Sequence, residues 1–140
     1  MDIPTQKFSE ATQCAPNAET LRTLSSGHLV GMSGKYGGYC WLGIPYASPP
    51  VGQWRWRAPR PAAPWQEMRA AINAGNPAAQ TIPVYQQKDL GACSHVGSED
   101  CLYLNIWSPA IAREAIAHSA ARLPVMVWIH GGARRYGRGD

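Results

Sequence analysis

The residues best suited to chemistry are His130, Gly131, Gly132 and Ala133, which directly follow the apolar run Leu123–Ile129. Glycines just after a strand allow the backbone to turn tightly and let amide N–H groups approach a ligand. Successive N–H groups aimed at one point stabilise the oxyanion that forms when a carbonyl becomes tetrahedral. The same four residues also fit an ordinary turn after a strand, so their significance depends on the rest of the chain.

The run at Leu123–Ile129 contains only apolar residues and one proline. A continuous apolar run of this kind is typical of a strand that is buried on both faces of the sheet in an α/β protein. We therefore expect residues 123–129 to form a strand that leads directly into His130. If its neighbouring strands and covering helices are absent, its apolar edge favours aggregation.

Further strands are expected N-terminal to this run. Residues 21–30 predict two short strands around the turn Ser25–Gly27, because glycine supplies the positive φ that such turns require. Aromatic and branched residues predict a strand at 39–44, and alternating apolar residues predict another at 102–107. Together with the run at 123–129, these strands indicate that the fold class is α/β.

Helical signals are fewer. One helical turn is expected at residues 66–71, and Ser108 and Pro109 suit the N-cap and first position of a helix that continues through His118. Residues 1–20 are polar and lack periodicity, so we expect a loose N-terminal arm. The length of 140 residues is that of one ordinary domain.

Residues 45–65 are rich in proline and contain Trp54, Trp56 and Trp65. Proline lacks the donor that a central ladder needs, and three exposed tryptophans would form an adhesive patch. We interpret the stretch as an extended segment that wraps over a core. A proline-rich ligand for an aromatic groove is the alternative, but the stretch lacks a clean PxxP repeat.

The 140 residues are 45% hydrophobic and 16% charged, with 14 Gly and 12 Pro. This composition argues against a collagen, a coiled coil and a wholly disordered chain. No stretch approaches the roughly 20 apolar residues of a membrane-spanning helix. The N-terminus shows no secretory signal, which favours the cytoplasm. The net charge of +4 is spread over separate arginine groups, so we expect no nucleic-acid partner and no membrane partner.

The four cysteines include no C-x-x-C pair, and no histidine pair has zinc spacing, so neither a metal nor a cofactor is expected. Cys93 and Cys101 flank a loop that contains glycine and serine. A disulfide between them would close this loop in an oxidising compartment, and a pair of reduced thiols is the alternative.

Several separated segments, in the right order across residues 21–137, resemble the type-B carboxylesterase family, which includes the cholinesterases. The matching segments are Gly43–Ala47 (GIPYA), Pro49–Gly52 (PPVG), Arg55-Trp56 with Pro59 and Pro64-Trp65, Ser98–Asn105 (SEDCLYLN), and Leu123–Gly132 with Gly137. The resemblance implies an α/β-hydrolase fold, with residues 21–140 as the N-terminal part of the domain up to the oxyanion loop. This part would contain a small N-terminal β-hairpin and the first strands of the central sheet. The resemblance also implies hydrolysis of small-molecule carboxylic esters through an acyl-enzyme. It also implies that the oxyanion donors are the N–H groups of Gly132 and Ala133, with Gly131 shaping the turn and His130 supporting the loop.

The resemblance has structural consequences as well. It implies a salt bridge between Arg55 and Glu99, and it places Cys101 where the family has one half of a disulfide. The family's usual partner cysteine precedes Gln80 by two residues, but this chain has Ala78 there. Arg134 stands where the family usually has an aromatic or aliphatic residue. Tryptophans in this half line the substrate gorge in family members, whereas core packing is the simpler role for Trp41, Trp54 and Trp56.

The 140 residues contain no G-x-S-x-G segment, and their histidines match none of the family's base positions. Acyl transfer needs a nucleophile, a base and an orienting acid. We therefore expect a fragment of a serine carboxylesterase that carries the oxyanion loop, lacks the catalytic triad and is inactive by itself. A non-catalytic cholinesterase-like binding or adhesion module is the alternative. Arg138–Asp140 also reads as an integrin tripeptide, which chance alone explains.

Overall fold

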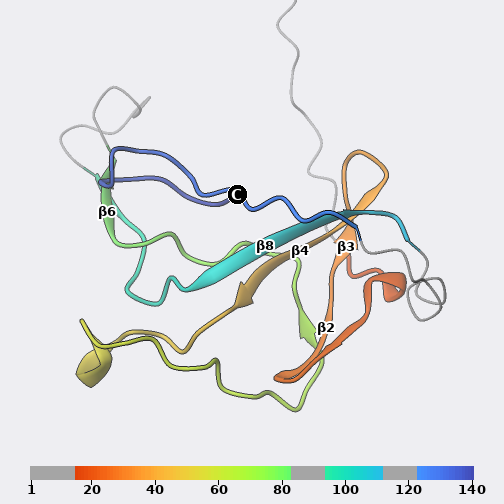
Figure 1. Ribbon diagram of the computed structural model, residues 1–140, viewed down its shortest axis with the longest axis horizontal. Coiled ribbons are helices and arrows are strands. Elements are labelled where there is room, and N and C mark those ends of the chain that lie inside the picture. Colours follow the sequence, from red (N-terminus) through yellow and green to blue (C-terminus); the bar gives the residue numbers. More distant parts are fainter. Residues whose placement is uncertain (1–14, 83–93, 112–122) are drawn as a thin grey trace, which may run out of the picture.

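The computed structural model describes residues 15–82, 94–111 and 123–140 (Figure 1). These residues contain two three-stranded sheets, one two-stranded sheet and two short 3-10 turns. In chain order the elements are η1 (Ala18–Thr20), β1 (Arg22–Leu24), β2 (Gly27–Val30), β3 (Met32–Ser33), β4 (Gly38–Pro45), η2 (Gly52–Trp54), β5 (Arg69–Ala70), β6 (Gln80–Ile82), β7 (Ser94–Val96) and β8 (Tyr103–Pro109). Among the described residues no helix has the length and apolar character needed to cross a bilayer.

The first sheet has the order β1-β2-β5 and contains the predicted hairpin. The turn requires Gly27, which has a φ of 143° and lies so close to Trp65 that an added Cβ would be 2.5 Å from the Trp65 carbonyl oxygen. β5 pairs in parallel with β2, with Leu29 opposite Arg69. The hairpin prediction is therefore confirmed, and a short parallel strand extends it.

The second sheet has the order β3-β4-β8, and all its pairs are antiparallel. Its strands β4 and β8 confirm the predictions at residues 39–44 and 102–107. The register shifts between Trp41 and Ile44, where Gly43 has a φ of 67°. Glycine tolerates this conformation, which most other residues avoid. The Gly43 amide leaves the ladder and donates to Asn105 Oδ1 at 2.9 Å.

Ala71 joins the two three-stranded sheets. Its amide donates to the Val30 carbonyl at 2.7 Å, and its carbonyl accepts from the Leu42 amide at 2.8 Å. Around this link lies the core, which is formed by side chains less than a tenth exposed: Leu29, Trp41, Ile44 and Ala71. Burial of such side chains is the main favourable contribution to folding. Trp41 thus belongs to the core, as the packing interpretation predicts.

The expectation of a loose arm over residues 1–20 is wrong at its C-terminal end. Residues 18–20 form η1, which is capped by the Asn17 side chain. Thr20 is completely buried, and its hydroxyl accepts from the Gly31 amide at 2.7 Å. The Thr20 carbonyl accepts from Trp41 Nε1 at 2.8 Å. These satisfied buried polar groups make η1 part of the fold, whereas residues 1–14 lie outside the described part of the chain.

The proline-rich stretch contacts the core only in part. Trp65 packs against the core and donates from Nε1 to the His28 carbonyl at 2.8 Å. The Arg60 guanidinium stacks on Trp54 at 3.4 Å from the ring centroid. Trp56, however, is 94% exposed and has a φ of 58°. The expectation that all three tryptophans cover a core is therefore wrong for Trp56, because no described residue packs on its ring.

Both helical expectations are wrong where the structure describes them. β8 continues through Ser108 and Pro109, and Ser108 lies opposite Tyr39, so these two residues end a strand instead of starting a helix. The remainder of that expected helix, at residues 112–118, lies outside the described residues. The helical turn expected at 66–71 is replaced by β5, since pairing with β2 outweighs local propensity.

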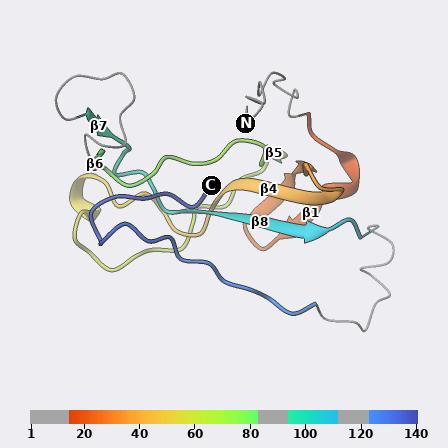
Figure 2. The same ribbon diagram turned by 90° about the horizontal axis from the view of Figure 1, so that it is seen from above.

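The strand expected at residues 123–129 is not formed either. Figure 2 shows this segment, in blue, running apart from β8, and no described strand pairs with it. Its side chains are exposed, from 49% at Leu123 to 97% at Met126. A buried parallel strand requires hydrogen-bonded neighbours and covering layers. The described part of the chain supplies neither, so an apolar composition alone does not produce the strand.

Candidate functional site: a glycine loop held by two amide side chains

The loop after residue 129 has an unusual backbone. Three consecutive residues have positive φ: Gly132 at 122°, Ala133 at 53° and Arg134 at 60°. Left-handed backbone costs about 1–2 kcal/mol for a residue with a side chain. A Cβ on Gly132 would lie 1.8 Å from the Tyr136 carbonyl oxygen, so only glycine fits there. Strain concentrated in a short exposed loop is a feature that functional sites often show.

His130 fixes the first peptide of this loop. Its Nδ1 lies 2.9 Å from the Gly131 carbonyl oxygen. Because a carbonyl oxygen can only accept, the Nδ1 atom carries the proton and donates it. The peptide between Gly131 and Gly132 is trans, so its N–H points away from its carbonyl. By holding the Gly131 carbonyl, the imidazole therefore sets the direction of the Gly132 N–H.

Two backbone amides fix the second peptide in the same way. The Gly132 carbonyl accepts from the Arg135 amide at 3.0 Å and from the Tyr136 amide at 3.3 Å. The peptide between Gly132 and Ala133 is also trans. Its N–H, which belongs to Ala133, consequently points away from the 132–136 turn.

The N–H groups of Gly132 and Ala133 themselves are available. Neither donates a hydrogen bond within the ranges that the structure describes, and His130, Gly131 and Ala133 are exposed to solvent. A donor whose peptide plane is held by other groups can bind an external acceptor without reorganising, and each of these two N–H groups meets that condition.

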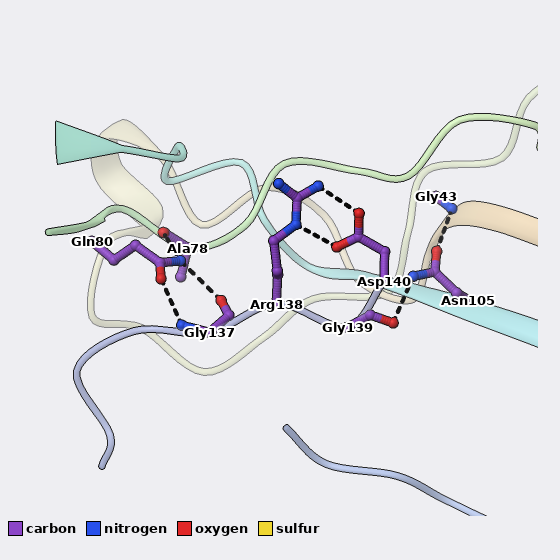
Figure 3. A network of polar contacts seen from close by, with 8 residues as sticks. All are labelled: Gly43, Ala78, Gln80, Asn105, Gly137, Arg138, Gly139 and Asp140. Atoms are coloured by element: carbon purple, nitrogen blue, oxygen red, sulfur yellow. Dashed lines mark hydrogen bonds and ion pairs between the residues drawn. The ribbon is translucent and has the colours of Figure 1, made fainter. Parts of the chain in front are cut away.

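Two side chains from the sheets hold the far end of the loop (Figure 3). Gln80 of β6 donates from Nε2 to the Gly137 carbonyl at 2.9 Å, and its Oε1 accepts from the Gly137 amide at 2.6 Å. Asn105 of β8 donates from Nδ2 to the Gly139 carbonyl at 3.0 Å. The sequence interpretation assigned no role to either residue, although Asn105 ends the matched segment Ser98–Asn105. Arg138, which lies between Gly137 and Gly139 in the chain, forms an ion pair with Asp140.

Arg55 and Glu99, expected to form a salt bridge, lie together with Nε and Oε1 2.5 Å apart. The pair joins the proline-rich stretch to the segment before β8. Both side chains are about half exposed, so the pair contributes at most about 1 kcal/mol to stability. The ion pair therefore fixes the proline-rich stretch beside the segment before β8 and does not take part in the chemistry of the loop.

Cys101, one half of the candidate disulfide, is a free thiol, and its candidate partner Cys93 lies outside the described residues. Burial, together with the carboxylates of Asp100 and Glu99, raises the pKa of the Cys101 thiol. A protonated thiol is a poor nucleophile. Cys101 therefore offers no activated group to the site.

The surroundings of the loop are open. One open cavity of about 480 Å³ lies beside residues 34–39 and 107–110, and another of about 320 Å³ lies beside residues 79–81 and 95–97, next to Gln80. Neither is lined by His130 or Ala133. In the described ranges no group of three His, Cys, Asp or Glu side chains is placed to hold a metal ion. The chemistry that the loop offers is thus hydrogen bonding from its backbone.

Comparison with solved structures defines the class of this fold. The chain superposes on a thermophilic PNB esterase with a TM-score of 0.67 and 38% identity, covering 85% of this chain and 23% of that one. It superposes on the Geobacillus stearothermophilus carboxylesterase EST55 with a TM-score of 0.64 and 37% identity, covering 84% and 21%. These proteins have the α/β-hydrolase fold, and this chain forms a partial, sheet-rich N-terminal portion of it.

Residues 18–140 match the model of the carboxylesterase family, and the chain belongs to that family. It is 43% identical over 104 residues to the para-nitrobenzyl esterase of Bacillus subtilis (strain 168), covering 71% of this chain and 19% of that protein. It is 42% identical over 116 residues to the cocaine esterase of Oryctolagus cuniculus, covering 79% and 21%. The chain thus spans about a fifth of the length of these relatives.

Proposed function

We propose that this chain supplies the oxyanion loop of a serine carboxylesterase that hydrolyses small-molecule carboxylic esters through an acyl-enzyme. The N–H groups of Gly132 and Ala133 donate to the carbonyl oxygen of the ester as it becomes an oxyanion. Gly131 allows the turn, and His130 orients the first donor. No cofactor, nucleic acid or membrane takes part in this reaction.

One observation carries the proposal. The carbonyls of Gly131 and Gly132 are both held by hydrogen bonds, while the N–H groups on the other side of the same peptides are unused within the described residues. Preorganised donors of this kind lower the barrier to acyl transfer, and one such donor contributes about 2.7–4 kcal/mol in the transition state. Membership in the carboxylesterase family supplies the matching reaction class.

The other half of the proposal is that these 140 residues do not turn over an ester alone. Acyl transfer requires an activated nucleophile and a base, and the sequence contains no G-x-S-x-G nucleophile segment. The pKa of Cys101 is raised by burial, which disfavours a thiolate substitute. Two oriented donors without a nucleophile bind an oxyanion but do not create one.

A hybrid enzyme tests both halves. The segment of the Bacillus subtilis para-nitrobenzyl esterase that matches this chain is replaced by residues 18–140. Para-nitrophenyl acetate hydrolysis and labelling by a fluorophosphonate probe are then measured for the hybrid and for residues 1–140 alone. We expect hydrolysis and labelling from the hybrid and neither from the 140-residue chain.

Two outcomes contradict the proposal. Burst kinetics and labelling of the 140-residue chain would show that it contains its own nucleophile. A hybrid that folds, as judged by circular dichroism, and takes up the probe but does not turn over would show that the loop is not an oxyanion donor. That second result favours the non-catalytic binding module, which retains the fold and does not hydrolyse esters.

A further inference from the structure

We infer that Gln80 and Asn105 are positioning residues, which hold the oxyanion loop in its donor conformation from two different sheets. This inference rests on the proposed function of the loop. Neither side chain forms a hydrogen bond with Gly132 or Ala133. Both act through glycines at the far end of the loop, at positions 137 and 139.

Gln80 makes a reciprocal pair of hydrogen bonds with the backbone of a single residue, Gly137. Its amide donates to the Gly137 carbonyl and its oxygen accepts from the Gly137 amide, at 2.9 and 2.6 Å. A second donation from Nε2 reaches the Ala78 carbonyl at 2.9 Å, which fixes the side chain against the backbone just before β6. Both contacts with Gly137 are partly buried, so water replaces them poorly.

Gly137 transmits this constraint to the loop. It has a φ of 137°, and a Cβ at this position would lie 2.2 Å from His130 Nδ1 and 2.6 Å from the Gly131 carbonyl oxygen. The backbone at Gly137 is thus packed directly against the hydrogen bond that orients the Gly132 N–H. If Gln80 releases Gly137, the support behind that hydrogen bond is lost.

Asn105 ties the loop to the bulge of β4. Its Oδ1 accepts from the Gly43 amide at 2.9 Å, and its Nδ2 donates to the Gly139 carbonyl at 3.0 Å (Figure 3). Because the Gly43 amide points out of the ladder at the bulge, it can donate to the Asn105 side chain. This hydrogen bond fixes the orientation of the Asn105 amide group. The contacts at Gly137 and Gly139 lie on either side of Arg138. Together they hold the backbone at the end of the loop at two points.

Two substitutions distinguish loss of these contacts from loss of folding. Gln80→Met removes both bonds to Gly137 at nearly constant length, with Gln53→Met on exposed η2 as its matched control. Asn105→Asp keeps the acceptor for Gly43 but loses the donor to Gly139. Its matched control is Asn76→Asp, which loses a donor to the Asp100 carbonyl instead.

The measurements are kcat and KM for para-nitrophenyl acetate in the hybrid, and amide hydrogen exchange in both the hybrid and the 140-residue chain. For Gln80→Met we expect kcat to fall about tenfold to 100-fold with KM nearly unchanged, because a small displacement of catalytic donors is costly. Exchange at Gly137 should accelerate about fivefold, as expected for one lost hydrogen bond. Asn105→Asp should lower kcat less, and both controls should match the parent.

Several results would overturn the inference. If kcat of Gln80→Met and Asn105→Asp stays within about twofold of an active parent hybrid, the side chains do not position the loop and the proposed function stands. If the parent hybrid is inactive, the proposed function fails by itself. In that case an unchanged hydrogen-exchange rate at the Gly137 amide in Gln80→Met would contradict the inference that Gln80 holds Gly137. A faster rate would support it.

Discussion

Strand β4 and residues 123–129 are similar in composition but differ in structure. Both are short, apolar and rich in aromatic or branched residues. β4 is paired on both edges and places Cys40, Trp41 and Ile44 in the interior. Residues 123–129 have no described strand partner, and Val127 is 81% exposed. The difference shows that strand formation is decided by available neighbours, because unpaired backbone groups and exposed apolar surface are both costly.

The glycine loop that follows is shaped in another way. It buries little, yet its conformation is defined by the His130 side chain, by the turn at Gly132 and by the clamps from Gln80 and Asn105. Hydrogen bonds within the loop and contacts from two side chains distant in the sequence are enough to define the conformation of the eleven residues 130–140. Residues 123–129, in contrast, need neighbouring strands to become a strand. We therefore expect the loop to keep its geometry when the strand before it is unpaired.

The largest effect should come from the paired region. Leu29 is 2% exposed in the core, so Leu29→Ala should lower the free energy of unfolding by about 2–5 kcal/mol through lost burial and a residual cavity. Urea unfolding followed by tryptophan fluorescence measures this. Val127→Ala is the matched control, and its effect should be within about 0.5 kcal/mol. Equal losses at the two positions would mean that residues 123–129 are packed after all.

A smaller effect on stability but a clear one on association is expected for the unpaired segment. Met126→Lys and Val127→Lys place charges on an exposed apolar run, which should reduce self-association without destabilising the fold. Light scattering against protein concentration measures this for residues 1–140. The same substitution at exposed Tyr36, which is 90% exposed on the β3–β4 turn, serves as the control. If self-association is unchanged in both Met126→Lys and Val127→Lys, the claim that residues 123–129 are an exposed apolar segment is contradicted.

The sequence predicts the local pairings of this fold better than its long-range ones. The hairpin over residues 21–30 and the strands that became β4 and β8 were visible as glycine turns and apolar patterns. The apolar run at 123–129 predicted a strand just as clearly, but this strand does not form among the described residues, because its formation depends on partner strands that a sequence pattern does not contain. Ser108 and Pro109 carry a good N-cap signal, but pairing of Ser108 with Tyr39 overrides it.

For the site, the sequence predicts the proposed donors Gly132 and Ala133 and the support from His130, but it misses the two side chains that hold the far end of the loop. Glycines after an apolar run identify the loop that contains Gly132, and the family motifs identify the pair Arg55 and Glu99. Gln80 and Asn105 lie 57 and 34 residues from their partners. Their roles depend on how the sheets bring them to the loop. A motif shows that such residues are present and does not show which carbonyl they hold.

The most direct test of the central claim is removal of a single backbone donor. In the hybrid enzyme, lactic acid in place of Ala133 turns the amide N–H into an ester oxygen and keeps the methyl side chain. The matched control is lactic acid in place of Ala63, an exposed alanine of the proline-rich stretch. We predict that kcat falls about 100-fold to 1,000-fold for position 133 and does not change for position 63. A folded hybrid with kcat unchanged at position 133 would contradict the claim that this amide stabilises the oxyanion.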